Sequence, residues 1–328
     1  MSGAQTLIGE PPGRIAPARE LVNTFEFEAM AQRSLSAAAF AEIAGSDRKA
    51  FERITLRPRM MVNTMQLDLT TELFGQRLFA PILVGPTSQQ KRFHPEGELA
   101  TVRGASAAKT LMVVSGRSSC PIPEIAAQPA ATLWYQVYPE PDADAQRRRI
   151  DQAVELGCKA LCIAIGGVDW SAIDRLRHGV RIPVLLKGIM SAEEARAAIG
   201  KGIDGIVVSN YGGQAASGMA APIEVLPAIA EAVAGKAPIL IDGSFRRGTD
   251  ILKALALGAR AVLLGRPALW ALAAYGSAGI QALLEMLQTE LARDMAMCGK
   301  PNLKSLDRSL VKIHSRNATA ASGRSAGS

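Results

Sequence analysis

The chain has few aromatic residues, histidines and cysteines. Aromatic side chains make up 5% of the 328 residues and are not interleaved with the basic ones, which argues against the stacking surface of a nucleic-acid-binding protein. Four cysteines without a CxxC pair and only three histidines argue against a metal site, so we predict none. We expect the cysteines to be reduced and buried.

The chain also lacks the signals of a membrane or exported protein. No segment approaches the roughly 18–20 consecutive apolar residues of a membrane span. The first residues, MSGAQTLIGEPPGRI, contain no signal-peptide apolar segment. We therefore expect a soluble, cytoplasmic protein with no membrane span.

What is present is the composition of a folded protein with a mildly basic surface. Hydrophobic residues make up 48%, enough for a sizeable core, and the 30 Gly and 18 Pro are close to average usage. The net charge of +7 is dispersed, apart from residues 147–149 and 246–247. We interpret it as a solvated surface, with no nucleic acid as partner.

Eight short runs rich in Val, Ile and Leu recur through the middle of the chain. Such runs, apolar without alternation, are typical of parallel strands covered on both faces. Ala-rich, charged segments of helical character separate them, so the pattern predicts an α/β fold, a (β/α)8 TIM barrel. No GxGxxG follows the first run, which disfavours an open dinucleotide-binding sheet. The runs are 80–86, 110–116, 132–138, 158–165, 183–189, 204–210, 237–243 and 260–266.

The ends of the chain fall outside this repeat. Residues 1–79 are predicted to form an N-terminal helical extension packed on the barrel. Residues 80–312 would contain the barrel and a closing helix, for which the helical spacing of apolar residues at 279–297 is the evidence. Residues 313–328 are predicted to be a flexible tail.

Two glycine-containing turns with arginines follow the last two runs. One reads Asp242-Gly243-Ser244-Phe245-Arg246, and the other reads Gly265-Arg266. Glycines let backbone N–H groups approach a phosphate, and arginine adds bidentate contacts. The alternative is two tight turns with surface arginines. Because these loops are the usual phosphate site of a (β/α)8 barrel, their convergence favours the phosphate.

Lys187 stands inside the apolar run 183–189. A lysine there needs an anionic partner. From the residues alone it could be a Schiff-base amine, a member of a structural ion pair, or a cation that faces an electron-rich cofactor ring.

Several ordered strings resemble the FMN-dependent 2-hydroxy-acid oxidase and dehydrogenase family, which includes glycolate oxidase, lactate oxidase and flavocytochrome lactate dehydrogenase. The resemblance runs from about Phe27 to Lys312. It implies the barrel fold and an FMN cofactor. The strings include LRPRMM, APILVGPTS, HPEGELATVRGA, WYQVYPEPD, LLKGI, SNYGGQ and RRGTDILKALALGARAVLLGRP.

The resemblance also implies which residues bind FMN. Pro86, Thr87 and Ser88 would run beneath the flavin, and Ser115 and Gln136 would contact its polar edge. Lys187 would face N1 and O2, where negative charge collects in the reduced ring, which favours the third interpretation of this lysine. The ribityl chain and phosphate would be held by Ser209, Asp242, Gly243, Ser244, Arg246, Gly265 and Arg266.

The substrate side departs from the family pattern. Where the family reads SNHGGR, with His as general base and Arg as carboxylate clamp, this chain has Tyr211 and Gln214. The Asp that orients the His is also missing, since the segment reads Ala164-Ile165-Gly166. A phenol with a pKa of about 10 is a poor base at neutral pH, and Gln brings no charge to a carboxylate.

Three further features bear on the substrate side. The family's long excursion after the fourth run, which carries a second substrate Arg and a mobile lid, is shortened here, and Glu42 stands roughly where the family has a substrate-facing Tyr. Of the histidines, His94 belongs to the shared HPEGE string and is interpreted as a packing residue of its loop, while His178 and His314 are not candidates. Tyr138 is the remaining substrate contact.

The sequence therefore predicts an FMN-binding oxidoreductase with an altered pocket and a non-standard small-molecule substrate, either uncharged or larger than the usual acids. Candidate catalytic residues are Tyr138, Tyr211 and Lys187, and candidate substrate contacts are Tyr138, Tyr211 and Gln214. One alternative is a catalytically weak flavin-binding protein of the same fold, and another is a phosphate-binding barrel without flavin. The electron acceptor is not specified by the sequence, and the resemblance implies a homo-oligomer, a tetramer.

Overall fold

The computed structural model describes residues 13–45, 47–59, 61–213 and 219–314. Its centre is a closed barrel of eight parallel strands, in which β11 pairs with β4 to complete the circle. Each of the eight predicted runs contains one strand, so the (β/α)8 prediction is confirmed. The strands are β4 (Ile82–Val84), β5 (Met112–Ser115), β6 (Leu133–Val137), β7 (Leu161–Ala164), β8 (Val184–Ile189), β9 (Gly205–Val208), β10 (Ile239–Ile241) and β11 (Ala261–Leu264).

The strands are apolar on both faces because both faces are covered. Leu83, Val113 and Leu185 belong to a cluster that fills the barrel, while Ile82 and Val114 belong to the larger cluster beneath the surrounding helices. The helices that follow the strands are α4 (Glu98–Ala107), α5 (Ile122–Ala126), α6 (Ala143–Glu155), α7 (Trp170–Arg177), α8 (Ala192–Gly200), α9 (Pro222–Val233), α10 (Gly248–Ala256) and the first part of α11 (Arg266–Met297).

Side-chain caps set the starts of several helices. Asp142, Asp169 and Ser191 each accept a hydrogen bond from a backbone N–H in the first turn of α6, α7 and α8. Such caps satisfy N–H groups that have no partner within the helix. The connection from β7 to α7 is short, since Ala164 ends the strand and Trp170 begins the helix.

A β-hairpin closes the amino-terminal end of the barrel. It consists of β2 (Thr71–Leu73) and β3 (Gln76–Leu78), and Leu73 and Leu78 join the cluster inside the barrel. Trp134 donates from Nε1 to Oε1 of Gln76 at 2.9 Å. The opposite end of the barrel, where the strands finish, is the end at which (β/α)8 enzymes have their active sites.

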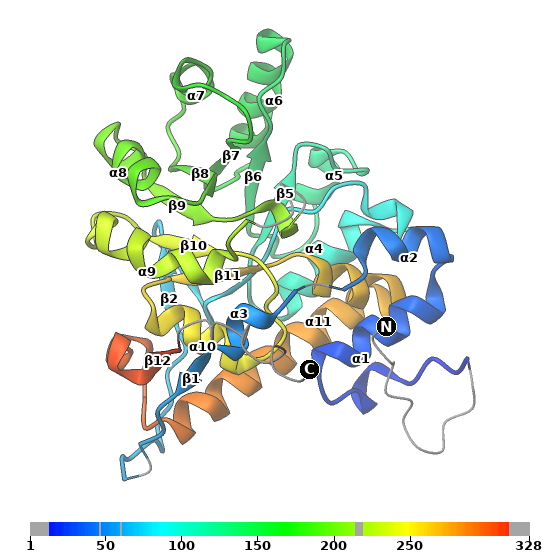
Figure 1. Cartoon of the computed structure of the whole chain (residues 1–328). Coiled ribbons are helices and arrows are strands. Elements are labelled where there is room, and N and C mark those ends of the chain that lie inside the picture. Colours follow the sequence, from blue (N-terminus) through cyan, green and yellow to red (C-terminus); the bar gives the residue numbers. More distant parts are fainter. Residues whose placement is uncertain (1–12, 46, 60, 214–218, 315–328) are drawn as a thin grey trace, which may run out of the picture.

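The N-terminal extension wraps around the barrel. It contains a 3-10 turn, η1 (Ala18–Glu20), and the helices α1 (Thr24–Ser34), α2 (Ala37–Ile43) and α3 (Lys49–Glu52). Figure 1 shows α1 beside α11, so segments far apart in the sequence form one layer. Strand β1 (Ile54–Leu56) pairs with β12 (Val311–Ile313), which places Ile313, the first residue of the predicted tail, in a strand; residues 315–328 lie outside the described residues.

The predicted closing helix lies in the second part of α11. Helix α11 begins at Arg266 and is interrupted at Gly276, which has φ +59 and ψ −138. A Cβ at this glycine would lie 3.0 Å from Nε2 of His94. The part before Gly276 is the eighth barrel helix, and the part after it contains the predicted segment 279–297. The two helices follow each other directly, because the chain changes direction at Gly276 alone.

Among the described residues, α11 is the one helix that is long and apolar enough to cross a membrane by length and composition alone. In its most apolar window, 61% of the residues are buried inside the protein. The helix packs against α1 and α4, so its apolar residues form part of the core.

The close contact between α4 and α11 yields a prediction. A Cβ at Gly104 would lie 2.5 Å from the carbonyl oxygen of Ser277 and 2.6 Å from Cβ of Ile280. Gly104→Ala should therefore lower the free energy of unfolding by about 1–3 kcal/mol, because the two helices must separate.

The matched control is Gly200→Ala, at the end of α8, where a Cβ would meet no atom within 4 Å. This variant should be neutral or slightly stabilised. Urea unfolding followed by circular dichroism measures both. Equal midpoints for the two variants would contradict the proposed contact.

Candidate active site

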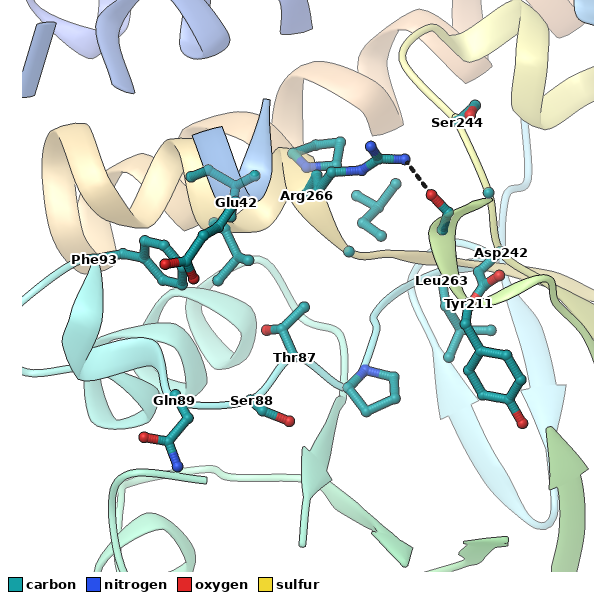
Figure 2. A pocket seen from close by; sticks show the side chains of 18 of the residues that line it. Glu42, Thr87, Ser88, Gln89, Phe93, Tyr211, Asp242, Ser244, Leu263 and Arg266 are labelled. Atoms are coloured by element: carbon teal, nitrogen blue, oxygen red, sulfur yellow. Dashed lines mark hydrogen bonds between the residues drawn. The ribbon is translucent and has the colours of Figure 1, made fainter. Parts of the chain in front are cut away.

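A cavity of about 730 Å³ lies at the carboxyl ends of the strands. The volume is typical of a small-molecule site. Its walls are the segments after β4, β5, β6, β8, β9, β10 and β11, and α2 covers one side (Figure 2). The sequence-predicted residues that line it are Pro86, Thr87, Ser88, Gln136, Tyr138, Lys187, Tyr211, Asp242, Gly243, Ser244, Arg246, Gly265 and Arg266.

Two predicted residues lie behind the lining. Ser115 is fully buried and its Oγ lies 2.9 Å from Oγ of Ser88 and 3.3 Å from the Tyr138 hydroxyl. Ser209 is also fully buried and its Oγ accepts a hydrogen bond from Nζ of Lys187 at 2.8 Å. Gln214 lies outside the described residues.

Lys187 forms a buried ion pair. Its Nζ lies 2.8 Å from Oδ2 of Asp242, and the Lys187 residue is 5% exposed. Burial alone would lower the pKa of Lys187, but the charge and hydrogen bond of Asp242 outweigh it, so the pKa is raised above its usual value. The lysine stays protonated at neutral pH, which disfavours the Schiff-base interpretation.

Two buried acceptor atoms in the cavity wall have no hydrogen-bond partner among the described residues. They are Oδ1 of Asp242, whose other oxygen binds Lys187, and Oε1 of Gln136. A buried polar atom without a partner costs about 1–3 kcal/mol. Both atoms therefore indicate a ligand that donates hydrogen bonds into this wall.

The turn after β10 has an unusual backbone. Gly243 has φ +105 and Ser244 has φ +63, so a serine occupies a left-handed position that favours glycine. Non-glycine residues hold such conformations mainly at functional sites, at a cost on the order of 1 kcal/mol. Successive residues in this region direct backbone N–H groups toward one point, which suits an anion.

Two arginines flank this turn. Arg246 is 2% exposed, its Cζ lies 4.4 Å from the ring centroid of Trp270, and its Nη1 donates to the carbonyl oxygen of Phe245. Burial, helped by the nearby charge of Arg266, lowers the pKa of Arg246 to about 9. A bound dianion would stabilise both cations, because it would replace the solvent that they have lost.

The helix ends near this turn are not equivalent. Asp250 accepts from the N–H groups of Arg246 and Arg247, and Glu290 accepts from that of Gly248, so the start of α10 is occupied by carboxylates. In contrast, α11 begins after Gly265 with no side-chain cap. Of the two helices, α11 is the one whose N-terminal end is not occupied by a carboxylate and can face an anion, although Pro267 has no N–H and the N–H of Ala268 donates to the carbonyl oxygen of Gly265.

The Tyr211 side chain is bonded to the backbone. Its hydroxyl donates to the carbonyl oxygen of Lys187 at 2.7 Å and accepts from the N–H of Gly166 at 3.1 Å. Burial raises the pKa of Tyr211 above its usual value, although the nearby Lys187 opposes this. In Figure 2 the ring points away from Ser244 and Arg266. A phenol held in this way retains its proton.

The three histidines all lie among the described residues, and none of them lines the cavity. His94 packs against Gly276 and accepts from the N–H of Glu96, His178 ends α7, and His314 contacts Thr55. A histidine base is therefore absent from the cavity walls that the structure describes.

Sequence reasoning missed two charged groups of the cavity mouth. Arg92 pairs with Glu42 of α2, and Arg117 follows β5. For Arg117 the signal was available, since it stands two residues after Ser115, at a strand end. For Arg92 the signal was indirect: the resemblance placed Glu42 on the substrate side, but nothing in the sequence showed that Arg92 would pair with it.

A buried carboxylate joins the loops after β4 and β5. Glu98 accepts hydrogen bonds from the N–H of Gln90, from the N–H and hydroxyl of Ser119, and from the N–H of Cys120. Burial would raise the pKa of Glu98, but these hydrogen bonds outweigh it and lower the pKa below its usual value. Glu98, the second glutamate of the HPEGE string, thus holds in place the two loops that form neighbouring walls of the cavity.

The family model of the FMN-dependent dehydrogenases matches residues 26–166 and 165–313. The chain belongs to the FMN-dependent dehydrogenase family. Its cofactor is FMN, and the protein is an FMN-dependent oxidoreductase. The two acceptors without partners and the glycine-serine turn fit this cofactor, because FMN offers hydroxyl and ring N–H donors together with a phosphate.

The named relatives and solved structures that the chain is similar to are oxidases of 2-hydroxy acids, lactate and mandelate, which agrees with the family. The peroxisomal (S)-2-hydroxyacid oxidase GLO3 of Arabidopsis thaliana is 33% identical over 89% of this chain and 97% of its own length. The L-lactate oxidase of a Nostoc species is 35% identical over 89% and 98%. The crystal structure of mandelate oxidase with (S)-2-phenylpropionate superposes with a TM-score of 0.86, at 33% identity, over 90% of this chain and 99% of that one.

The bonded state of Tyr211 yields a prediction. Tyr211→Phe removes both hydrogen bonds of the hydroxyl, so it should lower the free energy of unfolding by about 1–2 kcal/mol. FMN should remain bound, because the ring is retained. Tyr135→Phe, at a buried tyrosine of β6 whose hydroxyl has no hydrogen bond among the described residues, is the control and should change stability less. Chemical unfolding and the absorption spectrum measure the two effects.

The Glu98 network yields a pH-dependent prediction. Because its pKa is lowered on folding, Glu98 contributes stability above the unfolded pKa of about 4.5, and this is lost as the pH falls through the folded value. Glu98→Gln should therefore destabilise the protein at pH 7 by on the order of 2 kcal/mol. The difference from the unsubstituted protein should shrink below pH 4.5. A difference that stays constant from pH 7 to pH 3 would exclude the charge as its cause.

Proposed function

We propose that this FMN-dependent oxidoreductase oxidises a CH–OH group of a small molecule in a substrate pocket that differs from that of the family's 2-hydroxy-acid oxidases. The observation that carries the proposal is the state of Tyr211, at the position of the family's histidine base. Its hydroxyl is committed to backbone groups and its pKa is raised. The substrate is therefore proposed to be other than lactate or glycolate oxidised with an ordinary histidine base.

The short β7–α7 connection supports a more open pocket. The family model matches in two pieces that meet at residues 165–166. The alignment with the Arabidopsis oxidase extends over 351 positions, more than the 328 residues of this chain, so part of the relative has no counterpart here. We infer that the missing part is the family's excursion after β7 and that a larger substrate can enter.

The predicted residues are assigned to FMN as follows. The turn at Gly243 and Ser244, with Arg246, Gly265 and Arg266, would hold the phosphate. The free oxygens of Asp242 and Gln136 would accept from the ribityl chain and the ring, and Lys187 would face the electron-rich edge. Ser115 and Ser209 would support the lining, with Pro86, Thr87 and Ser88 beneath the ring. When bound, FMN supplies an acceptor for two electrons.

The protein's own groups near the substrate are proposed to orient rather than to remove a proton. Tyr138 lines the cavity and its hydroxyl lies 3.3 Å from Oγ of Ser115, so it can bind a substrate hydroxyl. Tyr211 would shape the pocket with its ring and fix the carbonyl of Lys187. Gln214 would add an uncharged contact. The relatives are named for 2-hydroxy acids, lactate and mandelate, so a hydroxy acid or related alcohol is the proposed class.

Assembly and location stay predictions: a homo-oligomer, with the tetramer that the resemblance implies, and a cytoplasmic enzyme. The relatives GLO3 and GLO4 of Arabidopsis are named as peroxisomal. The electron acceptor is an open part of the proposal.

Anaerobic bleaching of the bound flavin tests the proposed function. Purified protein loaded with FMN is mixed with a panel of hydroxy acids, alcohols and amines, and the visible absorption is followed. We expect at least one rapid reducer and slow reduction by lactate and glycolate. A missing general base slows a reaction about 10²–10⁴-fold.

The control is the double variant Tyr211→His and Gln214→Arg, which restores the family's residue types and should reduce faster with lactate or glycolate. Reduction of the unsubstituted protein by these two acids at ordinary family rates would refute the altered pocket. No reduction by any compound would favour the catalytically weak flavoprotein. A colourless protein that takes up no FMN would overturn the flavin assignment.

A further inference from the structure

Arg117 stands in the cavity wall at a position where the backbone is held on both sides. It follows Ser115, the last residue of β5, and its N–H donates to Oγ of Ser115 at 3.1 Å. Its carbonyl oxygen accepts from the N–H of Gln89 at 3.2 Å. The bonds of Glu98 to the same two loops add to this restraint. The base of the Arg117 side chain is therefore fixed at the cavity mouth.

The guanidinium of Arg117 lies over the ring of Tyr138, with Cζ 4.1 Å from the ring centroid. This contact orients the planar group and leaves its N–H edge available, because stacking uses the face of the guanidinium. Among the described residues, no carboxylate or carbonyl oxygen accepts from this side chain. Its donors are thus open to solvent or to a ligand.

The other cations of the cavity have protein acceptors. Lys187 is paired with Asp242, and Arg92 is paired with Glu42. The carbonyl oxygens of Phe245 and Gly212 accept from Arg246 and Arg266, respectively. Arg117 therefore differs from every other cation in the described lining of this cavity.

Arg117 also lies away from the turns assigned to the phosphate. Those turns follow β10 and β11, whereas Arg117 and Tyr138 follow β5 and β6, on the far side of β4 in the barrel order. From Tyr138 the contacts continue through Ser115 to Ser88, on the cavity floor. A molecule that contacts Tyr138 and Ser88 would lie on the same side of the cavity as Arg117, whereas Arg246 and Arg266 follow β10 and β11.

We propose that Arg117 is the group that binds a carboxylate of the substrate, with Tyr138 as the surface that holds its guanidinium flat. The inference rests on the proposed function and narrows it, because it favours an anionic substrate over an uncharged one. Arginine presents two parallel N–H donors that match a carboxylate, and it keeps its charge at any physiological pH. Arg117, which follows β5, would thus supply the positive charge that the uncharged Gln214 does not bring to the site.

The test measures equilibrium binding of unreactive compounds to the FMN-loaded protein by calorimetry. Acetate and phenylacetate are compared with acetamide and phenylacetamide, which match them in shape but carry no charge. We expect both carboxylates to bind more tightly than their amides and added salt to weaken them, because the contact is electrostatic. If neither carboxylate binds more tightly than its amide, the inference is overturned.

Substitution assigns the effect to one side chain. Arg117→Leu should weaken carboxylate binding about 10- to 100-fold, as expected for loss of a charged hydrogen-bonding partner, and leave amide binding within a factor of about two. Arg117→Lys should weaken carboxylate binding less than Arg117→Leu does, since lysine keeps the charge but not the planar pair of donors. The control is Arg148→Leu, an exposed arginine of α6 outside the cavity lining, with the same change in net charge.

Equal carboxylate binding by the unsubstituted protein and Arg117→Leu would refute the role of Arg117, even if the flavin spectrum and the substrate panel support the proposed function. Conversely, a protein that binds no FMN would refute the flavin assignment, and the same calorimetry on the protein without FMN would then report whether Arg117 binds carboxylates. Because Arg117 is exposed, its substitution should leave the fold unchanged, and thermal unfolding of each variant checks this.

Discussion

The site depends on the buried ion pair between Lys187 and Asp242. A buried ammonium is stable only with a paired charge and hydrogen bonds, and here Asp242 and Ser209 provide them. Lys187 lies within β8, and Ser209 and Asp242 directly follow β9 and β10, so these contacts link three neighbouring strands. Only one oxygen of Asp242 is used, and the other has no hydrogen-bond partner among the described residues.

The cavity has two sides, whose side chains are held in place to different degrees. On the β8–β11 side, buried charges and a left-handed turn form a surface that suits FMN and the family to which the chain belongs. On the β4–β6 side, Glu98 fixes the loops, and the lining includes the exposed side chains of Gln89, Arg92 and Arg117 beside the buried Gln136 and Phe93. The three exposed side chains are not among those proposed to bind FMN, so they can differ with the substrate while the proposed cofactor contacts stay.

Most of the barrel and of the cofactor side could be predicted from the sequence. Buried parallel strands appear as continuous apolar runs, and a lysine inside such a run, Lys187, or an arginine in the turn after one, Arg246, is recognisable in the sequence. The start of the closing helix was predicted only approximately, because the spacing of apolar residues does not show that Gly276 is the residue at which the chain turns. The pairing of β1 with β12 was not predictable either, because it joins segments about 250 residues apart and rests on backbone hydrogen bonds.

The sequence by itself determined the fold class, the two glycine-containing turns with arginines after the last two strands, and the absence of a histidine at position 211, because these follow from local residue types and strand ends. Only the tertiary structure decided what each side chain does there. It committed the Tyr211 hydroxyl to the backbone, gave Lys187 a carboxylate partner and left the guanidinium of Arg117 open to the cavity. Hydrogen bonding and charge pairing depend on neighbours brought together across the barrel, and a linear pattern does not contain those distances.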